Sequence, residues 1–399
     1  MSSFSLDRPL HDIDPLTPTH TEGEQLTGHG PLVPVNLYGG VRAWAATDLP
    51  TARTVFEDHP DLSKDPKHWG AYARGEIPAG WPILSLMTAE SMLNTDGIEH
   101  HRLRRLVSFA FTPKRVRALA PRITEITRGL LADMATKGSV DLKEDFAFPL
   151  PMMVICELFG VTDPGETRRL RTLFATMLSV EATGRQREDA AIGMKQMLRR
   201  LVDDKHATPG DDLTSELAAI RDEDDRLTMT ELVDTLEIIL LAGHETLVNA
   251  ITNTVYALLT HPRQLAEVLA GGHSWSAVLE AGLRWDGPVR SVYMRYATQD
   301  TVISGVTVRH GEPILVALAT ANRDGAGFDL SAPPAPHLAF GAGPHFCLGA
   351  TLARLEGEIA LRELFGRFPG LRMAVPETEL TTLISPALNG LAALPVIVG

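Results

Sequence analysis

The segment from Thr228 to Pro262 predicts a single helix of unusual length. It begins with Thr-Met-Thr-Glu, in which Thr228 and Glu231 form a capping box, and it contains no proline before His261-Pro262. About 32 helical residues span roughly 48 Å, because each residue of an α-helix rises about 1.5 Å. A helix of that length has to cross the whole body of a 399-residue protein. The other elements must therefore pack around it.

Most of the other segments also carry helical patterns. Ser274–Trp285 and Leu348–Phe365 have the pattern of shorter helices, the first ended by Asp-Gly-Pro. Residues 34–48, around a Gly-Gly turn, and residues 303–322 favour strands. Residues 182–227 are charged and carry turn signals, which indicates surface helices and loops. We therefore expect a mainly α fold with small peripheral β-sheets, built as one domain over residues 1–399.

Composition narrows the classes of function. The 37 basic and 50 acidic residues leave a net charge of −13, which argues against binding nucleic acid or an anionic membrane. The two cysteines, Cys156 and Cys347, are too few for a disulfide framework or a cysteine-rich zinc site. The N-terminal segment lacks the apolar core of a signal peptide, and the apolar tracts are too short to span a bilayer. We expect a cytoplasmic protein without membrane contact.

The middle of the long helix carries an unusual group of residues, Ala-Gly-His-Glu-Thr at 242–246. A carboxylate, a hydroxyl and an imidazole are costly to bury unless something uses them. The small residues Ala242 and Gly243 let a flat object approach the backbone. The alternative is structural: Thr246 bonds back to a carbonyl of its own helix, and Glu245 turns to solvent.

Cys347 stands in the loop Phe-Gly-Ala-Gly-Pro-His-Phe-Cys-Leu-Gly at 340–349. Several glycines around one side chain indicate a backbone that bends close to something bulky. Cys347 also opens a predicted helix, whose positive N-terminal end favours a thiolate. Cys156 lies in an apolar run and is interpreted as an inert buried residue.

The loop at 340–349 resembles the haem-binding loop of the cytochrome P-450 family. The family pattern F-x-x-G-x-[HR]-x-C-x-G is matched by Phe340, Gly343, His345, Cys347 and Gly349. The resemblance covers roughly residues 30–399 and is to soluble members of actinobacterial type, with further matching segments at residues 100–112, 209–228, 242–246 and 286–297. It implies a P-450 fold in which haem b, iron protoporphyrin IX, lies between the long central helix and the helix after the cysteine.

The resemblance also implies the roles of the site residues. Cys347 would be the thiolate ligand of the iron, a ligand that favours cleavage of the O–O bond. Thr246 would hydrogen-bond to dioxygen and Glu245 would relay protons, while Ala242 and Gly243 leave space for oxygen and substrate. The other residues expected to bind the cofactor are His100, Arg104, Arg295 and His345 at its propionates and Phe340, Gly341 and Gly349 in the loop. The alternative for the basic run at 100–105 is a solvated face.

The implied reaction is insertion of one oxygen atom from dioxygen into a small apolar molecule, such as a polyketide, a terpenoid or a steroid-like compound. Electrons would come from a ferredoxin and its reductase, because no flavin or iron–sulfur domain is recognisable in the chain. A docking face for the ferredoxin is expected on a monomer, formed by Arg102, Arg105, Lys114 and Arg115.

In the family, the Glu and Arg of an E-x-x-R pattern join a second arginine, from the loop ahead of the cysteine, in a buried ion-paired triad. Two positions of this chain depart from that triad. Arg284 is present, but Ala281 stands where the family has glutamate, and Gly327 stands where it has the second arginine. Paired losses suggest a compensated rearrangement. They also keep open a second reading, a haem-binding partner or ligand sensor with impaired turnover, and a third, a helical protein without haem.

We expect Arg284 to find new partners. The candidates are backbone carbonyls near residues 324–330 and one of three carboxylates. Glu280 is favoured, because it lies four residues before Arg284. Asp324 and Asp329 are the alternatives.

The segment at residues 69–92 is rich in large apolar side chains. They are candidates for the walls of a substrate pocket or, equally, for the protein core: Trp69, Tyr72, Trp81, Leu84 and Met87.

Overall fold

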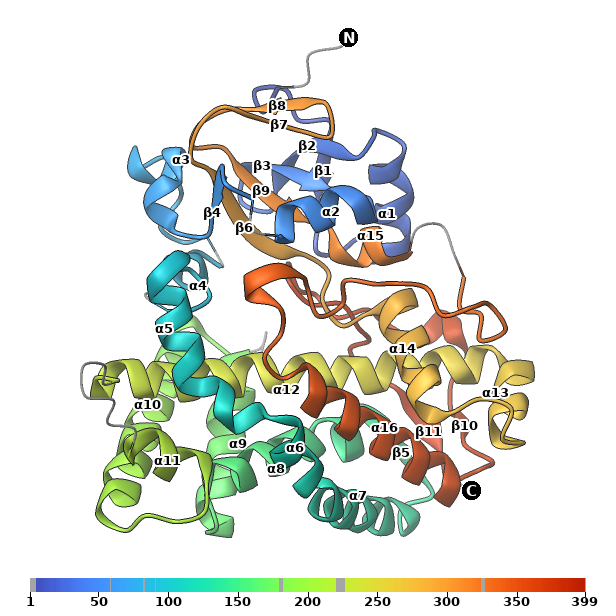
Figure 1. Ribbon diagram of the computed structural model, residues 1–399. Coiled ribbons are helices and arrows are strands. Elements are labelled where there is room, and N and C mark those ends of the chain that lie inside the picture. The colour runs from blue at the N-terminus through green and yellow to red at the C-terminus, as the bar shows by residue number, and fades with distance from the viewer. Residues whose placement is uncertain are drawn as a thin grey trace.

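The computed structural model describes residues 5–57, 59–81, 83–89, 91–178, 182–219, 227–323 and 327–398. Its central element is α12, Met229–Thr260, which crosses the full width of the helical region in Figure 1. Thr228 caps the helix in a complete capping box with Glu231, and His261 ends it before α13, Pro262–Leu269. The long helix predicted from the sequence is therefore confirmed at both ends.

Helices pack around α12 in one large apolar core. The segment Ser274–Trp285 forms α14, and the helix after the cysteine, α16, begins at Ala350, two residues later than predicted. The bounds are α4 Leu84–Thr88, α5 Gly97–Ser108, α6 Pro113–Ala118, α7 Ala120–Ala135, α8 Pro149–Phe159, α9 Pro164–Leu178, α14 Trp275–Asp286 and α16 Ala350–Arg367.

The charged segment at 182–227 is helical, as predicted. It forms α10, Gly184–Ala207, and α11, Leu213–Ala219, while residues 220–226 lie outside the described part. α10 buries Met194, Leu198 and Val202 on one face and leaves its charged face outward. Within the described ranges, we find no helix whose length and apolar character would let it cross a membrane.

A six-stranded mixed sheet lies on one side of the helical region, at the top of Figure 1. Its order is β1-β2-β3-β9-β6-β4, with β2 and β3 antiparallel around Gly39-Gly40 and β9 parallel to β3. The bounds are β1 His11–Ile13, β2 Leu32–Leu37, β3 Val41–Ala46, β4 Leu62–Ser63, β6 Val292–Ala297 and β9 Pro313–Val316. The sheet is larger than the sequence suggested, but the fold is mainly α.

One predicted strand is partly wrong. Residues 318–323 do not continue β9 but form α15, Leu318–Arg323, which lies beside α1, Thr19–Thr27, and near α2, Leu49–Phe56. The alanine-rich sequence has high helix propensity, and the Ala321 N–H bonds to the Ala317 carbonyl.

The remaining strands form two small sheets, in agreement with the prediction. β10 Arg372–Met373, β11 Pro395–Ile397 and β5 Ser139–Asp141 make the first, and the hairpin of β7 Thr301–Ile303 and β8 Val306–Val308 makes the second.

The aromatic residues of segment 69–92 belong to the core beneath the sheet. The ring of Trp69 stacks between Tyr72 and Tyr296, with centroids 5.8 and 5.5 Å away, and meets Trp81 edge-on at 5.7 Å. Trp69, Trp81 and Met87 are buried in this cluster, and Leu84 packs against it. Of the two readings left open by the sequence, the core reading holds for Trp69, Trp81 and Met87, whereas Tyr72 is 41% exposed.

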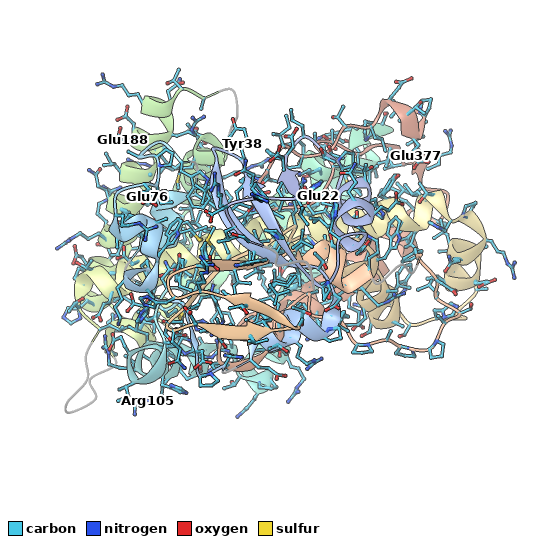
Figure 2. All side chains as sticks on the ribbon, turned by 90° about the horizontal axis from the view of Figure 1, so that it is seen from above. Glu22, Tyr38, Glu76, Arg105, Glu188 and Glu377 are labelled. Carbon is cyan, nitrogen blue, oxygen red and sulfur yellow. The ribbon has the colours of Figure 1, made fainter. Side chains whose placement is uncertain are left out.

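Most charged side chains lie at the periphery, but several are buried, and Glu22 is one of them. In Figure 2, Arg105, Glu188 and Glu377 lie around the rim, whereas Glu22 on α1 lies inside the outline. Glu22 is buried and forms an ion pair with Arg290, which also donates to the carbonyl of Asp14. This ion pair ties α1 to the segment that enters β6.

Candidate functional site

The Cys347 loop bends sharply before α16. Gly341 and Gly343 have φ of 70° and 69°, in the left-handed region that favours glycine. A Cβ on Gly343 would lie 2.6 Å from the Phe56 carbonyl oxygen, so the position cannot hold a side chain without a shift of the backbone. The Cys347 N–H bonds to the Phe340 carbonyl at 2.9 Å. These contacts hold the cysteine three residues ahead of the helix.

The surroundings of the Cys347 sulfur act in opposite directions on its pKa. Burial is the largest influence and raises the pKa of the thiol. The backbone N–H groups of Gly349 and Ala350 and the charges of Arg104 and Arg354 lower it. The N-terminal end of α16 therefore lowers the pKa of Cys347, as expected from the sequence, but by less than burial raises it. Although protein atoms crowd the Cys347 sulfur, the residue as a whole is accessible to solvent, whereas Cys156 is buried, with a pKa raised to about 11.

The middle of α12 presents an exposed face, although the helix crosses the core. Ala242 and Gly243 are exposed and Thr246 is half-buried. Thr246 Oγ1 donates to the Ala242 carbonyl at 2.6 Å, as in the structural alternative considered from the sequence. A small-residue face of this kind accepts a flat group against the helix backbone.

Glu245, in contrast, does not turn to solvent. Its side chain is 12% exposed, and Oε1 lies 3.5 Å from Nδ1 of His244. The His244 ring is fully buried between Phe148 and Phe174, with centroids 4.4 and 4.6 Å away, and its Nε2 lies 2.8 Å from the Phe148 carbonyl. That carbonyl can only accept, so His244 Nε2 carries a proton and Nδ1 faces the carboxylate.

A buried lysine lies behind this pair, which the sequence gave no means of finding. Lys143 Nζ donates to Asn249 Oδ1 at 3.1 Å and to the Leu391 carbonyl at 2.8 Å. Asn249 in turn donates to the backbone carbonyl of Glu245 at 2.9 Å. Burial lowers the pKa of Lys143, and the negative charge of Glu245 opposes that shift.

The cationic residues expected at the propionates come together in the structure. The rings of His100 on α5 and His345 in the Cys347 loop lie 4.1 Å apart. Arg104, one turn after His100, donates to the Phe346 carbonyl. Arg295 on β6 donates to the Phe56 carbonyl at 3.2 Å, and its charge acts on His345.

Two further residues belong to this cluster and were missed from the sequence. Asp96 Oδ1 lies 3.0 Å from His345 Nε2, and its other oxygen accepts from Ser63 Oγ at 2.9 Å. Lys64 Nζ donates to the Tyr293 carbonyl at 2.9 Å. Burial and the nearby Arg295 lower the pKa of Lys64 to about 8. Asp96 directly precedes α5. This position before a basic helix is the one sequence signal that could have identified Asp96 as a member of the cluster.

The cluster fits a group that carries two carboxylates. The three cations Lys64, Arg104 and Arg295 exceed the single carboxylate of Asp96 by two charges. His100 is buried, its Nδ1 has no hydrogen-bond partner within the described residues, and burial lowers its pKa to about 4. An orphaned donor or acceptor beside surplus positive charge is the environment that an anionic ligand satisfies.

Two residues of the basic face predicted for redox-partner docking pair with carboxylates of this chain. Arg102 pairs with Glu99 at 2.7 Å and also with Glu231, and Arg115 pairs with Glu216. The solvated-face alternative for the basic run at 100–105 holds for His101 and Arg105, which are exposed, whereas His100 is buried and Arg104 donates to the Phe346 carbonyl.

The prediction for Arg284 is right for the backbone and wrong for Glu280. Arg284 Nη2 donates to the Gly327 carbonyl at 3.5 Å. Glu280 points away from it and binds Arg354 and His337 instead, because one helical step of about 100° separates it from the position of Ala281. Arg284 acts on Asp329 only through its charge, and Asp324 lies outside the described residues.

The comparisons with known proteins agree with this geometry. The family model for cytochrome P450 matches residues 180–270 and 276–379. A 2-hydroxy-5-methyl-1-naphthoate 7-hydroxylase from Streptomyces carzinostaticus is 40% identical over 95% of this chain and 94% of its own length. A vitamin D(3) 25-hydroxylase from Pseudonocardia autotrophica is 41% identical over 89% of this chain and 88% of its own.

A solved structure supports the same assignment. It is described as "Testerone bound CYP154C4" from a Streptomyces species, is 39% identical, and covers 100% of this chain and 99% of its own with a TM-score of 0.92. Because relatives at this level of identity span nearly the whole sequence, the chain belongs to the cytochrome P450 family of haem-thiolate enzymes and is an oxidoreductase of the monooxygenase class.

Proposed function

We propose that this protein inserts one oxygen atom from dioxygen into a small apolar molecule of polyketide, terpenoid or steroid-like type, with haem b held by Cys347. The observation that carries the proposal is the exposed Cys347, whose loop leads into a helix packed on α12 and lies beside a surplus of positive charge. When bound, haem supplies an iron centre at which dioxygen is reduced and cleaved.

The chain's own residues would bind and orient the cofactor. Cys347 would supply the thiolate, and Gly341 and Gly343 would let its loop approach the cofactor. Arg104 and Arg295, with His100 and His345, hold the two propionates. Lys64 adds the charge that balances Asp96.

Residues of α12 would handle the protons. The reaction takes up two protons and two electrons and releases the second oxygen atom as water. Thr246 keeps the lone pairs of its hydroxyl oxygen available, because its own proton is donated to Ala242. Glu245 would relay protons from a side chain that is only 12% exposed and whose Oε1 lies 3.5 Å from His244 Nδ1. Ala242 and Gly243 leave room above the helix for oxygen and substrate.

The substrate class is proposed by analogy with the relatives. The relatives above are named for a naphthoate and for vitamin D(3), and the similar structure is described with a bound ligand named testerone. A 6-deoxyerythronolide B hydroxylase is also 38% identical over 93% of this chain. By analogy with these names, we assign the substrate here to small organic molecules of polycyclic or macrocyclic type.

Electrons would come from a ferredoxin and its reductase. We keep the docking contact on the predicted face of Arg102, Arg105, Lys114 and Arg115, where Arg102 and Arg115 also pair with carboxylates of this chain. We propose that residues 1–399 act as one domain, which is supported by packing of α15, beside the sheet, on α14 of the helical region. The cytoplasmic location and the monomeric state stay predictions from the sequence.

The test combines binding and turnover. A panel of apolar polycyclic and macrocyclic compounds is screened for a shift of the Soret band, and the compounds that bind are then incubated with ferredoxin, reductase and reduced nicotinamide cofactor. We expect hydroxylated product in proportion to the cofactor consumed. Binding shifts without any product, across several ferredoxins, would favour the ligand-sensor reading instead.

A further inference from the structure

Glu280 on α14 forms a two-bond ion pair with Arg354 near the Cys347 loop. Arg354 Nε on α16 donates to Glu280 Oε1 at 2.6 Å, and Arg354 Nη2 donates to Oε2 at 3.1 Å. The two parallel bonds form the forked geometry in which arginine binds carboxylates most strongly. Both side chains are only about one third exposed, at 35% and 39%. This pair joins the two helices that flank the loop.

His337 brings the loop itself into the same contact. Its Nδ1 accepts the backbone N–H of Ala339 at 3.1 Å, so the other nitrogen, Nε2, carries the proton. Nε2 lies 2.9 Å from Glu280 Oε2 and therefore donates to it. A neutral histidine is sufficient for this arrangement. Glu280 thus receives hydrogen bonds from α16 and from the segment that leads to Cys347.

The contact continues from Arg354 to the cysteine. The guanidinium of Arg354 lies over the Phe340 ring, 4.3 Å from its centroid. The backbone carbonyl of Phe340 accepts the N–H of Cys347 at 2.9 Å. The charge of Arg354 also lowers the pKa of Cys347. An unbroken chain of contacts therefore runs from Glu280 through Arg354 and Phe340 to Cys347.

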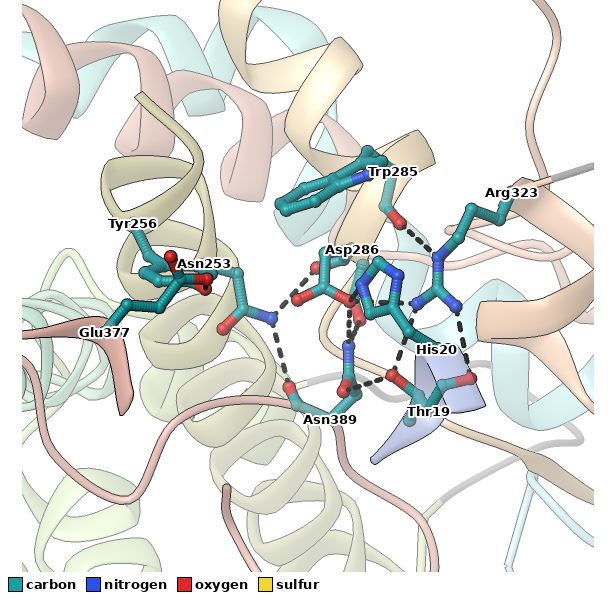
Figure 3. A network of polar contacts seen from close by, with 10 residues as sticks. Thr19, His20, Asn253, Tyr256, Trp285, Asp286, Arg323, Glu377 and Asn389 are labelled. Atoms are coloured by element: carbon teal, nitrogen blue, oxygen red, sulfur yellow. Dashed lines mark hydrogen bonds and ion pairs between the residues drawn. The ribbon is translucent and has the colours of Figure 1, made fainter. Parts of the chain in front are cut away.

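Arg284, the residue retained from the family pattern, is held far more weakly. In the described part of the chain, its side chain makes one hydrogen bond, the 3.5 Å contact with Gly327. Other residues hold the end of α14, and Figure 3 shows their contacts with Trp285 and Asp286. Arg323 donates to the Trp285 carbonyl at 2.9 Å and to Asp286 at 3.0 Å, and Asn389 donates to Asp286 at 2.9 Å.

We propose that Glu280, Arg354 and His337 form a clamp that positions the Cys347 loop, in place of the E-x-x-R contact that Ala281 and Gly327 have lost. The proposal rests on the proposed function in one respect, that Cys347 is the haem ligand. Glu280 is a positioning residue, because it acts on Cys347 only through Arg354 and Phe340. We call these three residues the Glu280 clamp.

The first test uses Glu280→Gln, which keeps the shape of the side chain and removes its charge. Arg354 then loses its carboxylate partner, and the loop loosens. In the haem-loaded protein we expect transfer of haem to an excess of apomyoglobin to be faster by about tenfold, the size expected for loss of one charge-assisted hydrogen bond. The long-wavelength Soret band of the reduced carbon monoxide complex should also convert faster to the short-wavelength form that has lost thiolate ligation.

Two matched variants serve as controls. Arg284→Gln changes the neighbouring turn of the same helix, and Glu363→Gln breaks another ion pair of α16, the one between Glu363 and Arg128. Both should change haem transfer less than twofold. If Arg284→Gln accelerates haem loss and Glu280→Gln does not, the clamp is overturned.

A second variant covers the case in which Glu280→Gln fails to fold. Arg354→Lys keeps the positive charge but removes the fork and the flat group over Phe340. Arg354→Lys should again speed haem transfer about tenfold. Glu280→Asp, which keeps the carboxylate, should retain haem better than Glu280→Gln. Haem retention equal to the unmodified protein in Arg354→Lys would contradict the proposal.

A readout without haem separates this proposal from the assignment of the ligand. In the apo-protein, amide hydrogen exchange at Cys347 reports its bond to Phe340. Glu280→Gln should speed this exchange about tenfold, and Arg284→Gln should not. If the unmodified protein shows no thiolate band but the exchange difference is present, the ligand assignment fails and the clamp stands. Equal exchange in both variants and the unmodified protein would overturn the clamp.

Discussion

Thr246 donates its hydroxyl proton to the carbonyl oxygen of Ala242, 2.6 Å away and one turn earlier on α12. The bond commits the proton to the helix and leaves the hydroxyl oxygen as an acceptor on the exposed face. A threonine that bonds back to its own helix is common and is often purely structural. What distinguishes Thr246 is its position, next to Glu245 and on the face where Ala242 and Gly243 are exposed.

Thr246→Ala removes this acceptor without adding bulk. We expect haem binding to survive, while more of the consumed oxygen appears as peroxide and less as product, by several-fold. Thr252→Ala is the matched control, because Thr252 makes the same kind of bond, to the Val248 carbonyl at 2.8 Å, but is fully buried. The measurement is product and peroxide per reducing equivalent. Unchanged yield in Thr246→Ala would exclude it from the proton relay.

Cys347→Ser should abolish thiolate ligation. The reduced protein under carbon monoxide is expected to show the long-wavelength Soret band of thiolate-bound haem, and the variant should lack it, because a serine hydroxyl is not deprotonated at neutral pH. Cys156→Ala removes the other, buried sulfur and should leave the band in place. The band persisting in Cys347→Ser would refute the assignment.

Glu245→Gln keeps the shape of the side chain but cannot carry a proton. We expect turnover to fall by about 10²-fold, within the range for loss of a general acid or base, with a larger solvent isotope effect. Glu237→Gln, two turns earlier on α12, removes a carboxylate that pairs with Lys195 and is the control. Steady-state rates in light and heavy water check this. Equal isotope effects in all three proteins would show that Glu245 does not limit proton transfer.

The stability of the haem-free protein should fall in mildly acidic solution because of His100. Burial lowers the folded-state pKa of His100 to about 4, below its ordinary value of 6.5. Between these pH values, the unfolded chain binds a proton that folded His100 does not, so the free energy of unfolding decreases as the pH falls from about 6.5 to about 4. His100→Gln should flatten this slope without abolishing it, since the pKa of His345 is also lowered. Urea unfolding at a series of pH values measures the slope of the unfolding free energy against pH. The same slope in His100→Gln and in the unmodified protein would contradict the prediction.

Restoring the two missing family residues should be cooperative. Ala281→Glu alone adds a carboxylate with no second arginine to balance it. Gly327→Arg alone adds a side chain into open space, since a Cβ at Gly327 would contact nothing within 4 Å. Together they should raise the free energy of unfolding by about 1 kcal/mol more than the sum of the single variants. Melting temperatures of the four proteins test this, and strictly additive changes would show that the two departures are independent.

Local features of this protein were predictable from the sequence. The bounds of α12 follow from the capping box at Thr228 and the proline at 262, and the turn between β2 and β3 follows from Gly39-Gly40. Such signals act through contacts between residues a few positions apart, which the chain order itself displays. The Cys347 loop and the group at 242–246 were found in the same way, because each is a short pattern of specific residue types.

The tertiary structure alone decided which distant side chains meet. Glu280 pairs with His337 and Arg354, which lie 57 and 74 residues away, and not with the neighbouring Arg284. Asp96 and Lys64 belong to the cationic cluster, and Trp69 belongs to the core, because packing of the fold brings distant segments together. A side chain's burial and partners depend on how helices pack and rotate, and a single helical step of about 100° is enough to exchange one partner for another.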